Sequence, residues 1–348
     1  MIDYKKNLIQ SGSIIKQALL KLNDVPDTLT LFVLNSDGMM IGTLTDGDIR
    51  RGFLKGYQLT DEVDMFMSSA FQSLKKKDCA YERINQLKRQ RIKLLPFLDE
   101  NNRIIRIFDL QRLRSILPID VVLMAGGRGE RLRPLTDNTP KPLLKIGNKP
   151  IIEHNIDNLL SYGIENIFIT IKYLGSQIIE HFGSNGYKNI QIKYIEETQP
   201  LGTIGSVRLI RDFVHDNVLV MNSDLFTNID FGEFFEHFIN EDADMAVATT
   251  PYNVDIPYAV VTSNERSIVS FTEKPTYTYY SNAGIYLIKR KLFDQIPVNR
   301  FFNATDFMQS LLDNGHKVIN FPILGYWIDI GKPEDYRKTQ EFYKYLKF

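Results

Sequence analysis

The sequence predicts an α/β protein in which a mixed, mainly parallel sheet follows a smaller α+β domain. Apolar, β-rich segments such as DVVLMAG (120–126), NIFITIK (166–172) and NVLVMNSD (217–224) alternate with helix-like ones such as IIEHNIDNLLSYG (151–163). Strand alternating with helix indicates a mainly parallel sheet covered on both faces. The first 118 residues differ, because they contain an internal repeat. A length of 348 residues suits two domains.

The repeat joins two segments at an offset of 64 residues. LFVLNSDGMMIGTLTDGDIR (31–50) and LPFLDENNRIIRIFDLQRLR (95–114) align without a gap. Each predicts a strand, a polar turn, a second strand and the start of a helix. Amphipathic helical stretches precede the two units, at 14–23 and 81–90. Because neither half can bury its apolar faces alone, we expect the two to pack into one small domain.

A linker is expected at SILPID (115–120), where Pro118 discourages continuation of a helix. The predicted boundaries are therefore an N-terminal domain at 1–118 and a larger domain at 119–348. The chain ends in EDYRKTQEFYKYLKF (334–348), which predicts a closing helix with a stripe of Tyr and Phe side chains.

The composition excludes several classes of protein. Lys+Arg and Asp+Glu both number 42, so no overall basic field favours nucleic acid or a membrane surface. The single cysteine, Cys79, cannot form an intramolecular disulfide. The N-terminus has no apolar signal-peptide core, and no apolar run approaches the roughly 20 residues that span a bilayer. We therefore expect a soluble, cytoplasmic protein.

The most informative stretch is VVLMAGGRGERLRPLTDNTPKPLL, in which a strand runs into glycines. The P-loop pattern is absent, because no Gly-Lys-Ser/Thr follows. The dinucleotide fingerprint also fails: counted from Gly127 and Gly129, its third glycine would fall on Leu132. What remains is Gly126-Gly127-x-Gly129 followed by Arg131. Such glycines admit phosphate oxygens to backbone N–H groups, and an arginine offers them a fork of donors.

This stretch resembles the GGxGTRLxPLTxxxPKPL signature of the nucleotide-sugar pyrophosphorylases, which transfer nucleotidyl groups to sugar 1-phosphates. The resemblance extends from about residue 120 to about 335 and implies a Rossmann-like nucleotidyltransferase domain. One departure is Glu130, where the family usually has threonine, and we expect it to point away or to pair with Arg128 or Arg133. The matching residues are Gly126, Gly127, Gly129, Arg131, Leu132, Pro134, Leu135, Thr136, Pro140, Lys141, Pro142 and Leu143.

The resemblance implies roles for the signature cations and for two aspartates. Arg131 would bind the triphosphate and assist departure of pyrophosphate, while Lys141, held between two prolines, would bridge the phosphates. Asp224 and Asp329 fall where the family's metal aspartates fall, so Mg²⁺ is the expected cofactor and Asp224 counts as catalytic. Isolated aspartates at strand ends are often only turn or cap residues.

Two further segments resemble the family's sugar pocket, VSFTEKP (269–275) and SNAGIYLI (281–288). They imply that sugar hydroxyls and the sugar phosphate are bound by Glu273, Lys274, Asn282 and Gly284. Glu273 and Lys274 taken alone could be an ordinary surface ion pair.

The loop EETQPLGTIGSV (196–207) resembles the one that reads the base, with backbone contacts from Gly202 and Thr203. A carboxylate could accept from N1–H and the 2-amino group of guanine together. Glu197 is placed to do so, with Glu196 as the substitute.

The N-terminal repeat resembles a pair of CBS domains. GTLTDGDIRR (42–51) fits the segment in which Thr45 and Asp48 would bind the ribose of an adenosyl nucleotide. At the same places the second repeat has Asp109 and Arg112, so at most one such site is intact. A structural role, such as pairing two chains into a homodimer, stays equally open.

A CBS pair ahead of a pyrophosphorylase resembles the glucosamine-1-phosphate guanylyltransferases of bacterial legionaminic acid biosynthesis. This implies GTP and glucosamine 1-phosphate as the substrates, with mannose-1-phosphate guanylyltransferase or glucose-1-phosphate thymidylyltransferase as alternatives. An alternative of another class is a catalytically silent, nucleotide-sensing subunit. Silent relatives tend to lose the signature arginine, lysine or metal aspartates, whereas all four are present here.

Overall fold

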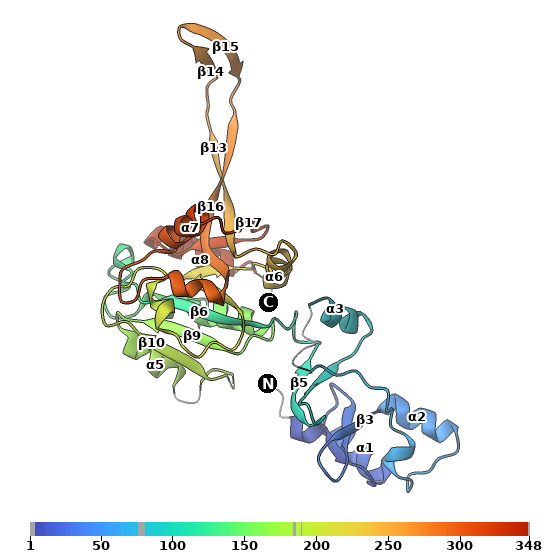
Figure 1. The fold of residues 1–348 in the computed structure, drawn as a ribbon. Helices are drawn as coiled ribbons and strands as arrows, with labels where there is room; N and C mark the ends of the chain where they lie inside the picture. Colours follow the sequence, from blue (N-terminus) through green and yellow to red (C-terminus); the bar gives the residue numbers. More distant parts are fainter. Residues whose placement is uncertain (1–3, 76–80, 184–185, 189, 347–348) are drawn as a thin grey trace. The chain divides into compact units, whose positions relative to one another are not determined.

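In the computed structural model, the chain forms two compact units (Figure 1). The first comprises Met1–Leu117 with Ser161–Gly163, and the second comprises Pro118–Leu160 with Ile164–Phe348. Cys79, considered above, lies outside the described residues. The structure describes residues 4–75, 81–183, 186–188 and 190–346.

The first unit contains the predicted repeat. β4 (Leu94–Leu98) and β5 (Ile104–Asp109) form an antiparallel pair, as do β2 (Thr30–Leu34) and β3 (Met40–Thr45). The offset of 64 also relates their registers, since Thr30 pairs with Thr45 and Leu94 with Asp109. The other elements of this unit are η1 (Tyr4–Asn7), β1 (Leu8–Gln10), α1 (Ile15–Asn23), α2 (Asp46–Leu54), η2 (Val63–Met65) and α3 (Tyr81–Arg89).

Both halves of the repeat contribute to one apolar cluster. Phe32 and Met40 of the first half are buried together with Leu94 and Ile107 of the second. This contact supports the expectation that neither half buries its faces alone.

The helix expected after the second strand pair is not formed, and this prediction was wrong. In the first half, Thr45 caps α2 and forms a reciprocal capping box with Asp48. In the second half, Asp109 accepts instead from the backbone N–H of Gln111, and its other oxygen pairs with Arg112. The chain therefore turns at 110–112 instead of continuing as a helix.

The second unit is built on a seven-stranded sheet in the order β10-β9-β6-β11-β16-β13-β17. All neighbours are parallel except that β16 runs antiparallel to both β11 and β13. The predicted mixed, mainly parallel sheet is therefore confirmed. The strands are β10 (Ile192–Glu196), β9 (Ile167–Ile171), β6 (Ile119–Ala125), β11 (Asn217–Asn222), β16 (Thr276–Lys289), β13 (Met245–Asp255) and β17 (Val318–Pro322).

Helices and short ladders surround this sheet. Buried apolar strand residues such as Val122 and Val220 pack against Phe307 of α7 and Leu292 of η6. The helices are α4 (Ile151–Leu160), α5 (Gly175–Phe182), α6 (Phe231–Asn240), α7 (Ala304–Asp313), α8 (Pro333–Tyr343), η3 (Glu130–Leu132), η4 (Lys141–Leu143), η5 (Gly205–Leu209) and η6 (Arg290–Gln295). The ladders are β7 (Lys145–Ile146) with β8 (Lys149–Pro150), β12 (Leu225–Thr227) with β18 (Trp327–Asp329), and β14 (Val260–Asn264) with β15 (Ser267–Thr272).

A long ribbon projects from the sheet of the second unit (Figure 1). It consists of the outer parts of β13 and β16, which stay paired from Thr249↔Asn282 to Asp255↔Thr276, with β14 and β15 at its tip. None of residues 251–282, all of which are described, is buried. We call residues 251–282 the arm.

Within the described parts of the chain, no helix is both long enough and apolar enough to cross a bilayer.

Candidate functional site

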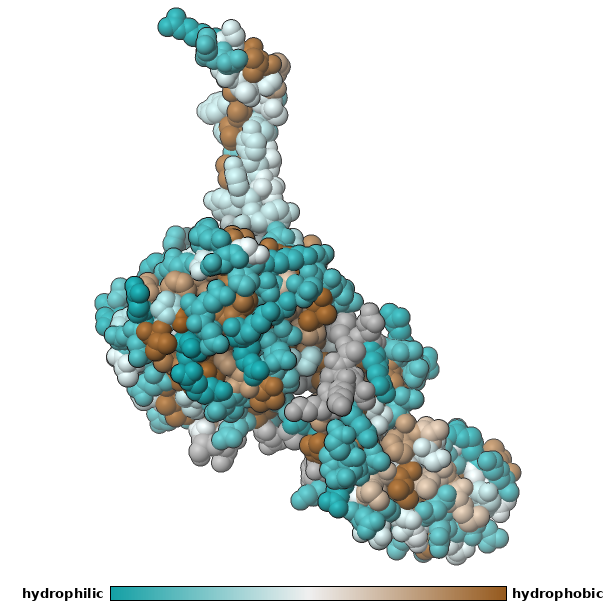
Figure 2. All heavy atoms as spheres, viewed as in Figure 1, coloured by the Kyte–Doolittle hydropathy of each residue, from teal (hydrophilic) through white to brown (hydrophobic). Residues whose placement is uncertain are grey.

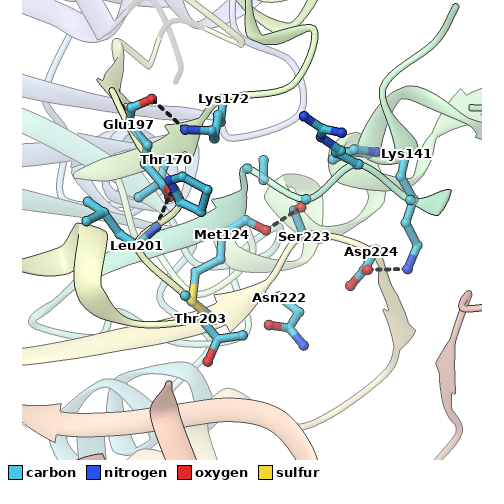
Figure 3. Close-up of a pocket in the computed structure, with 18 of the residues that line it drawn as sticks. Met124, Lys141, Thr170, Lys172, Glu197, Leu201, Thr203, Asn222, Ser223 and Asp224 are labelled. Atoms are coloured by element: carbon cyan, nitrogen blue, oxygen red, sulfur yellow. Dashed lines mark hydrogen bonds and ion pairs between the residues drawn. The ribbon is translucent and has the colours of Figure 1, made fainter. Parts of the chain in front are cut away.

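A cavity of about 760 Å³ lies where the parallel strands of the second unit end (Figure 3). It is lined by the loop after β6, by Lys172 after β9, by Glu197 after β10 and by Asp224 after β11. The carboxyl ends of parallel strands are where open α/β sheets bind ligands. The sequence-predicted residues that line the cavity are Gly126, Gly127, Gly129, Arg131, Lys141, Glu197, Gly202, Thr203 and Asp224.

The glycine loop turns back on itself directly after β6. Gly129 has φ +62°, and a Cβ built there would lie 3.0 Å from Thr136 Cγ2, so glycine is required. The Thr136 hydroxyl donates to the Gly129 carbonyl at 2.8 Å and holds the turn. The next turn, η3, contains Arg131. Its Nη2 atom lies close to Gly331, 3.2 Å from the position that a Cβ would occupy on that glycine.

Lys141 lies at the centre of a cluster of opposite charges. Its side chain is only 11% exposed, it forms an ion pair with Asp224, and its Nζ is 3.7 Å from Asp329 Oδ1. The β12–β18 ladder brings the two aspartates together, because Leu225 pairs with Asp329. Burial and the neighbouring Asp224 raise the pKa of Asp329, against the opposing charges of Lys141 and Arg131.

The two aspartates have the chemistry of a magnesium site that is completed by substrate phosphates. Mg²⁺ is usually held by one or two carboxylates together with phosphates and water. Asp224 Oδ1 is buried and has no hydrogen-bond partner among the described residues, which leaves it available as a ligand. The described residues contain no group of three or more His, Cys, Asp or Glu side chains that could hold a metal by themselves.

Glu197 lies on another side of the cavity from Asp224 and Lys141 (Figure 3). It is 8% exposed, and its Oε2 accepts from the backbone N–H of Leu201 at 3.3 Å. Burial raises the pKa of Glu197, although hydrogen bonds from Leu201 and Ser206 and the charge of Lys172 oppose the shift. Glu196, its proposed substitute, is an exposed residue of β10. Of the two glutamates, Glu197 is therefore the one placed at the cavity.

The loop at 196–207, which was expected to read the base, is tied to α7. The hydroxyl of Thr203 accepts from the backbone N–H of Ala304 at 2.8 Å, and the N–H of Phe302 donates to the Leu201 carbonyl at 3.0 Å. The side chain of Thr203 therefore anchors the loop, and any contact with a nucleotide falls to its backbone.

The predicted sugar-side residues are divided between the arm and the sheet. Glu273 and Lys274 lie on the arm, and neither is among the described residues that line the cavity. Asn282, the last residue of the arm, belongs to β16 and accepts from the N–H of Gly284, which lies in the sheet, at 2.9 Å. Gly284 has φ +71°, and a Cβ there would lie 2.4 Å from Asn222 Nδ2, at the wall of the cavity. The structure thus places Gly284 against Asn222, a residue of the cavity wall. Among the described residues that line the cavity, none is a predicted sugar-side residue: Glu273, Lys274, Asn282 and Gly284 are all absent.

Lys172 is a cavity residue that the sequence reasoning missed. It follows β9 and approaches Glu197, its Nζ lying 3.5 Å from the Glu197 carbonyl (Figure 3). The signal was present in NIFITIK, because a lysine directly after a buried parallel strand must lie at the same sheet edge as the glycine loop.

Glu130, the departure from the signature, is largely exposed and lies 3.8 Å from Arg128. Arg133 pairs instead with Asp137 at 3.3 Å. Of the arrangements expected for Glu130, pairing with Arg128 is the one found.

The first unit contains a separate pocket of about 440 Å³, formed by both halves of the repeat. Thr45 lines it, together with two cations, Arg91 and Lys93. Asp48 is not among the described residues that line this pocket. Its carboxylate accepts from the Thr45 hydroxyl at 2.6 Å and pairs with Arg51 at 2.5 Å.

Residues 120–345 match the nucleotidyl transferase family, and the chain belongs to this family. It is 32% identical over 235 residues to the bifunctional protein GlmU of Methanocaldococcus jannaschii, covering 64% of this chain and 54% of that protein. It is 31% identical to the D-glycero-alpha-D-manno-heptose 1-phosphate guanylyltransferase of Aneurinibacillus thermoaerophilus, covering 64% of this chain and 97% of the relative.

A solved structure shows the same fold. HddC from Yersinia pseudotuberculosis, crystallised with GMP-PN, is 26% identical and superposes with a TM-score of 0.51, covering 65% of this chain and 99% of that one. Against GlmU the chain spans only about half of the relative's length.

Proposed function

We propose that the second unit transfers a nucleotidyl group from GTP to a sugar 1-phosphate and releases pyrophosphate, with Mg²⁺ held by Asp224 and Asp329. The observation that supports this most strongly is the convergence of Arg131, Lys141 and Asp224 at one cavity, with Asp329 Oδ1 3.7 Å from Lys141 Nζ. A triphosphate carries about four negative charges and needs such a set of cations and metal ligands.

In the proposed reaction, an oxygen of the sugar phosphate attacks the α-phosphorus of the nucleotide. The bond from that phosphorus to the β-bridging oxygen breaks, and its electron pair leaves with pyrophosphate. Lys141 neutralises charge on the transferring phosphoryl group, and Arg131, presented by the turn after Gly129, stabilises the departing pyrophosphate. Bound Mg²⁺ would neutralise phosphate charge and help to align the two substrates.

The preference for guanine is proposed from Glu197. Its carboxylate is held by Leu201 N–H at the cavity, and a carboxylate matches the paired N1–H and 2-amino donors of guanine. The names of relatives are consistent with this base, since the Aneurinibacillus protein is a guanylyltransferase. Glu197→Gln would offer only one acceptor, so we expect the preference for GTP over the other triphosphates to fall.

The acceptor is proposed to be glucosamine 1-phosphate, as in legionaminic acid biosynthesis, on the basis of the domain order alone. Mannose-1-phosphate guanylyltransferase and glucose-1-phosphate thymidylyltransferase remain the alternatives. The test is pyrophosphate release from GTP, dTTP, UTP, CTP and ATP, each with glucosamine, N-acetylglucosamine, mannose or glucose 1-phosphate. Preference for another pair would keep the reaction and discard these substrates.

For the first unit, we propose that it is a pair of CBS domains and that it binds an adenosyl nucleotide in the pocket beside Thr45. Arg91 and Lys93 supply cations suited to phosphates, which supports a ligand role over a purely structural one. Asp48 would have to release Thr45 to reach a ribose. If wild-type protein binds nucleotide here but releases no pyrophosphate with any pair of substrates, the silent sensor becomes the better account.

A further inference from the structure

The arm exposes far more apolar surface than an unpartnered ribbon in water can maintain. A two-stranded ribbon is marginally stable by itself, yet ten large apolar side chains of the arm are between 37% and 75% exposed. Figure 2 shows brown residues along its length. The ten are Tyr252, Val254, Tyr258, Val261, Ile268, Val269, Phe271, Tyr277, Tyr279 and Tyr280.

The amount of surface matches what a stable protein interface needs. Six of the ten side chains are aromatic and about 60% exposed on average, so at roughly 200 Å² each they present about 700 Å². A standard interface buries about 800 Å² per partner. The charged residues of the arm are three acidic and two basic, so it has no excess charge to attract an anionic surface or to repel a like arm.

The arm cannot reach the cavity of its own chain in this conformation. β13 and β16 stay paired without a break from Thr249 to Asp255, six steps of about 3.4 Å, which places Glu273 and Lys274 about 20 Å along the ribbon. Folding the arm back would require that ladder to break. The cavity itself offers an uncovered apolar group, because Phe301 lines it and is 62% exposed.

We infer that the arm packs on a second copy of this chain, and that each copy supplies Glu273 and Lys274 to the cavity of the other. The role of those two residues in binding the sugar phosphate is the one that the resemblance implies, and it rests on the proposed function, but the pairing of the arms does not. An exchange between identical chains is symmetric, so one arm completes each cavity and both apolar ribbons are covered.

Trans-complementation tests the exchange. Arg131→Ala disables a cavity but keeps a normal arm, whereas Glu273→Gln with Lys274→Ala disables an arm but keeps a normal cavity. In heterodimers purified with two different affinity tags, one cavity is normal and receives a normal arm, so we expect about half of wild-type pyrophosphate release. Activity no higher than in the separate variants would overturn the inference. The matched control pairs Arg131→Ala with Lys141→Met and should recover nothing.

Hydrogen exchange of the full-length protein tests the pairing without any activity. We expect arm amides to be protected at high protein concentration and to lose protection on dilution, and Val269→Asp with Phe271→Asp to lose it throughout. Leu312→Asp, an exposed apolar position of α7, is the control that should leave the arm protected. If the exchange rates of the arm amides do not change with protein concentration, the pairing is overturned. Any protection of these amides would then come from another partner or from the chain's own body.

The two tests separate failure of this inference from failure of the proposed function. If the wild-type protein releases no pyrophosphate, the proposed function fails and the exchange experiment still decides whether the arms pair. If the wild type is active and complementation fails, the function stands and the arm acts on its own chain.

Discussion

At Asp224 the two carboxylate oxygens have different surroundings. Oδ2 pairs with Lys141, while Oδ1 is buried without a hydrogen-bond partner among the described residues. A buried, unpaired carboxylate oxygen is costly unless a ligand satisfies it. The pairing with Lys141 therefore leaves one oxygen of Asp224 without a partner among the described residues. A negatively charged oxygen in this position is suited to hold a cation between the protein and the phosphates.

Replacement of Asp224 by asparagine should reduce turnover by about 100-fold or more at limiting Mg²⁺, because a metal ligand and its charge are weakened. Pyrophosphate release across a Mg²⁺ titration measures this, and the variant should require more Mg²⁺ for half-maximal activity. Asp216→Asn, at a carboxylate that is 90% exposed, is the control. A titration curve that coincides with the wild type would remove Asp224 from the metal site.

Glu197 predicts a dependence of stability on pH. Burial raises its pKa above the ordinary value of 4.5, which the unfolded chain retains. At a pH between the pKa of Glu197 in the unfolded chain and its raised pKa in the folded protein, the folded protein binds more protons. The contribution of Glu197 to stability therefore falls as pH rises through this range. Glu197→Gln cannot ionise and should melt above the wild type at about pH 8, by a margin that shrinks as the pH approaches 4.5. Thermal unfolding across that range measures the margin, and a constant difference would contradict the assignment.

At the scale of elements, the site depends on strands that end at one edge and on one short ladder. The carboxyl ends of β6, β9 and β11 place Gly126, Lys172 and Asp224 at the cavity, and that much follows from an apolar strand pattern. The β12–β18 register, which sets Asp329 beside Asp224, joins segments about a hundred residues apart, and three-residue strands have no pattern that a sequence can show.

The arm shows the same limit of sequence reasoning. VSFTEKP was matched only to a sugar-pocket segment, and in the structure its first four residues end β15. Alternation does not reveal whether the apolar face meets the chain's own body or another copy. Glu273 and Lys274 were expected at the sugar pocket, and their distance from the cavity of their own chain was not foreseeable.

Gly284→Ala should destabilise the fold by about 1–3 kcal/mol, since the new Cβ would clash with Asn222 and φ is positive. Equilibrium denaturation with urea measures the change. Gly127→Ala is the matched control, because nothing lies within 4 Å of a Cβ there. It should keep wild-type stability while raising the KM for the nucleotide, since its added methyl group would stand where phosphate oxygens approach. Equal stability of the two variants would contradict this view of β16.

At the scale of the whole molecule, two pockets belong to two units of different fold. The two strand pairs of the repeat could be predicted, because its two halves share an offset that the sequence displays, and the same offset relates the registers found. Whether the pocket of the first unit binds a ligand depends on a few side chains. In this conformation the hydroxyl of Thr45 donates a hydrogen bond to the carboxylate of Asp48.

If the first unit binds an adenosyl nucleotide, ATP or AMP should raise the melting temperature of the full-length protein, and Thr45→Ala should reduce that rise. The ligand-induced shift is the quantity to compare, because loss of the Thr45 cap alone costs about 1 kcal/mol. Thr262→Ala, on the exposed arm, is the control. An identical shift in Thr45→Ala and wild type would place the nucleotide elsewhere.

The most direct test of the central claim is to identify the products formed from GTP and a sugar 1-phosphate in the presence of Mg²⁺. Mass spectrometry of the reaction, with pyrophosphate measured in parallel, should find a nucleoside diphosphate sugar and pyrophosphate in equal amounts. Lys141→Met, which removes the charge between the two aspartates, should form neither at a comparable rate. Wild-type protein that forms no nucleoside diphosphate sugar from any of the twenty donor and acceptor pairs proposed above would contradict the account.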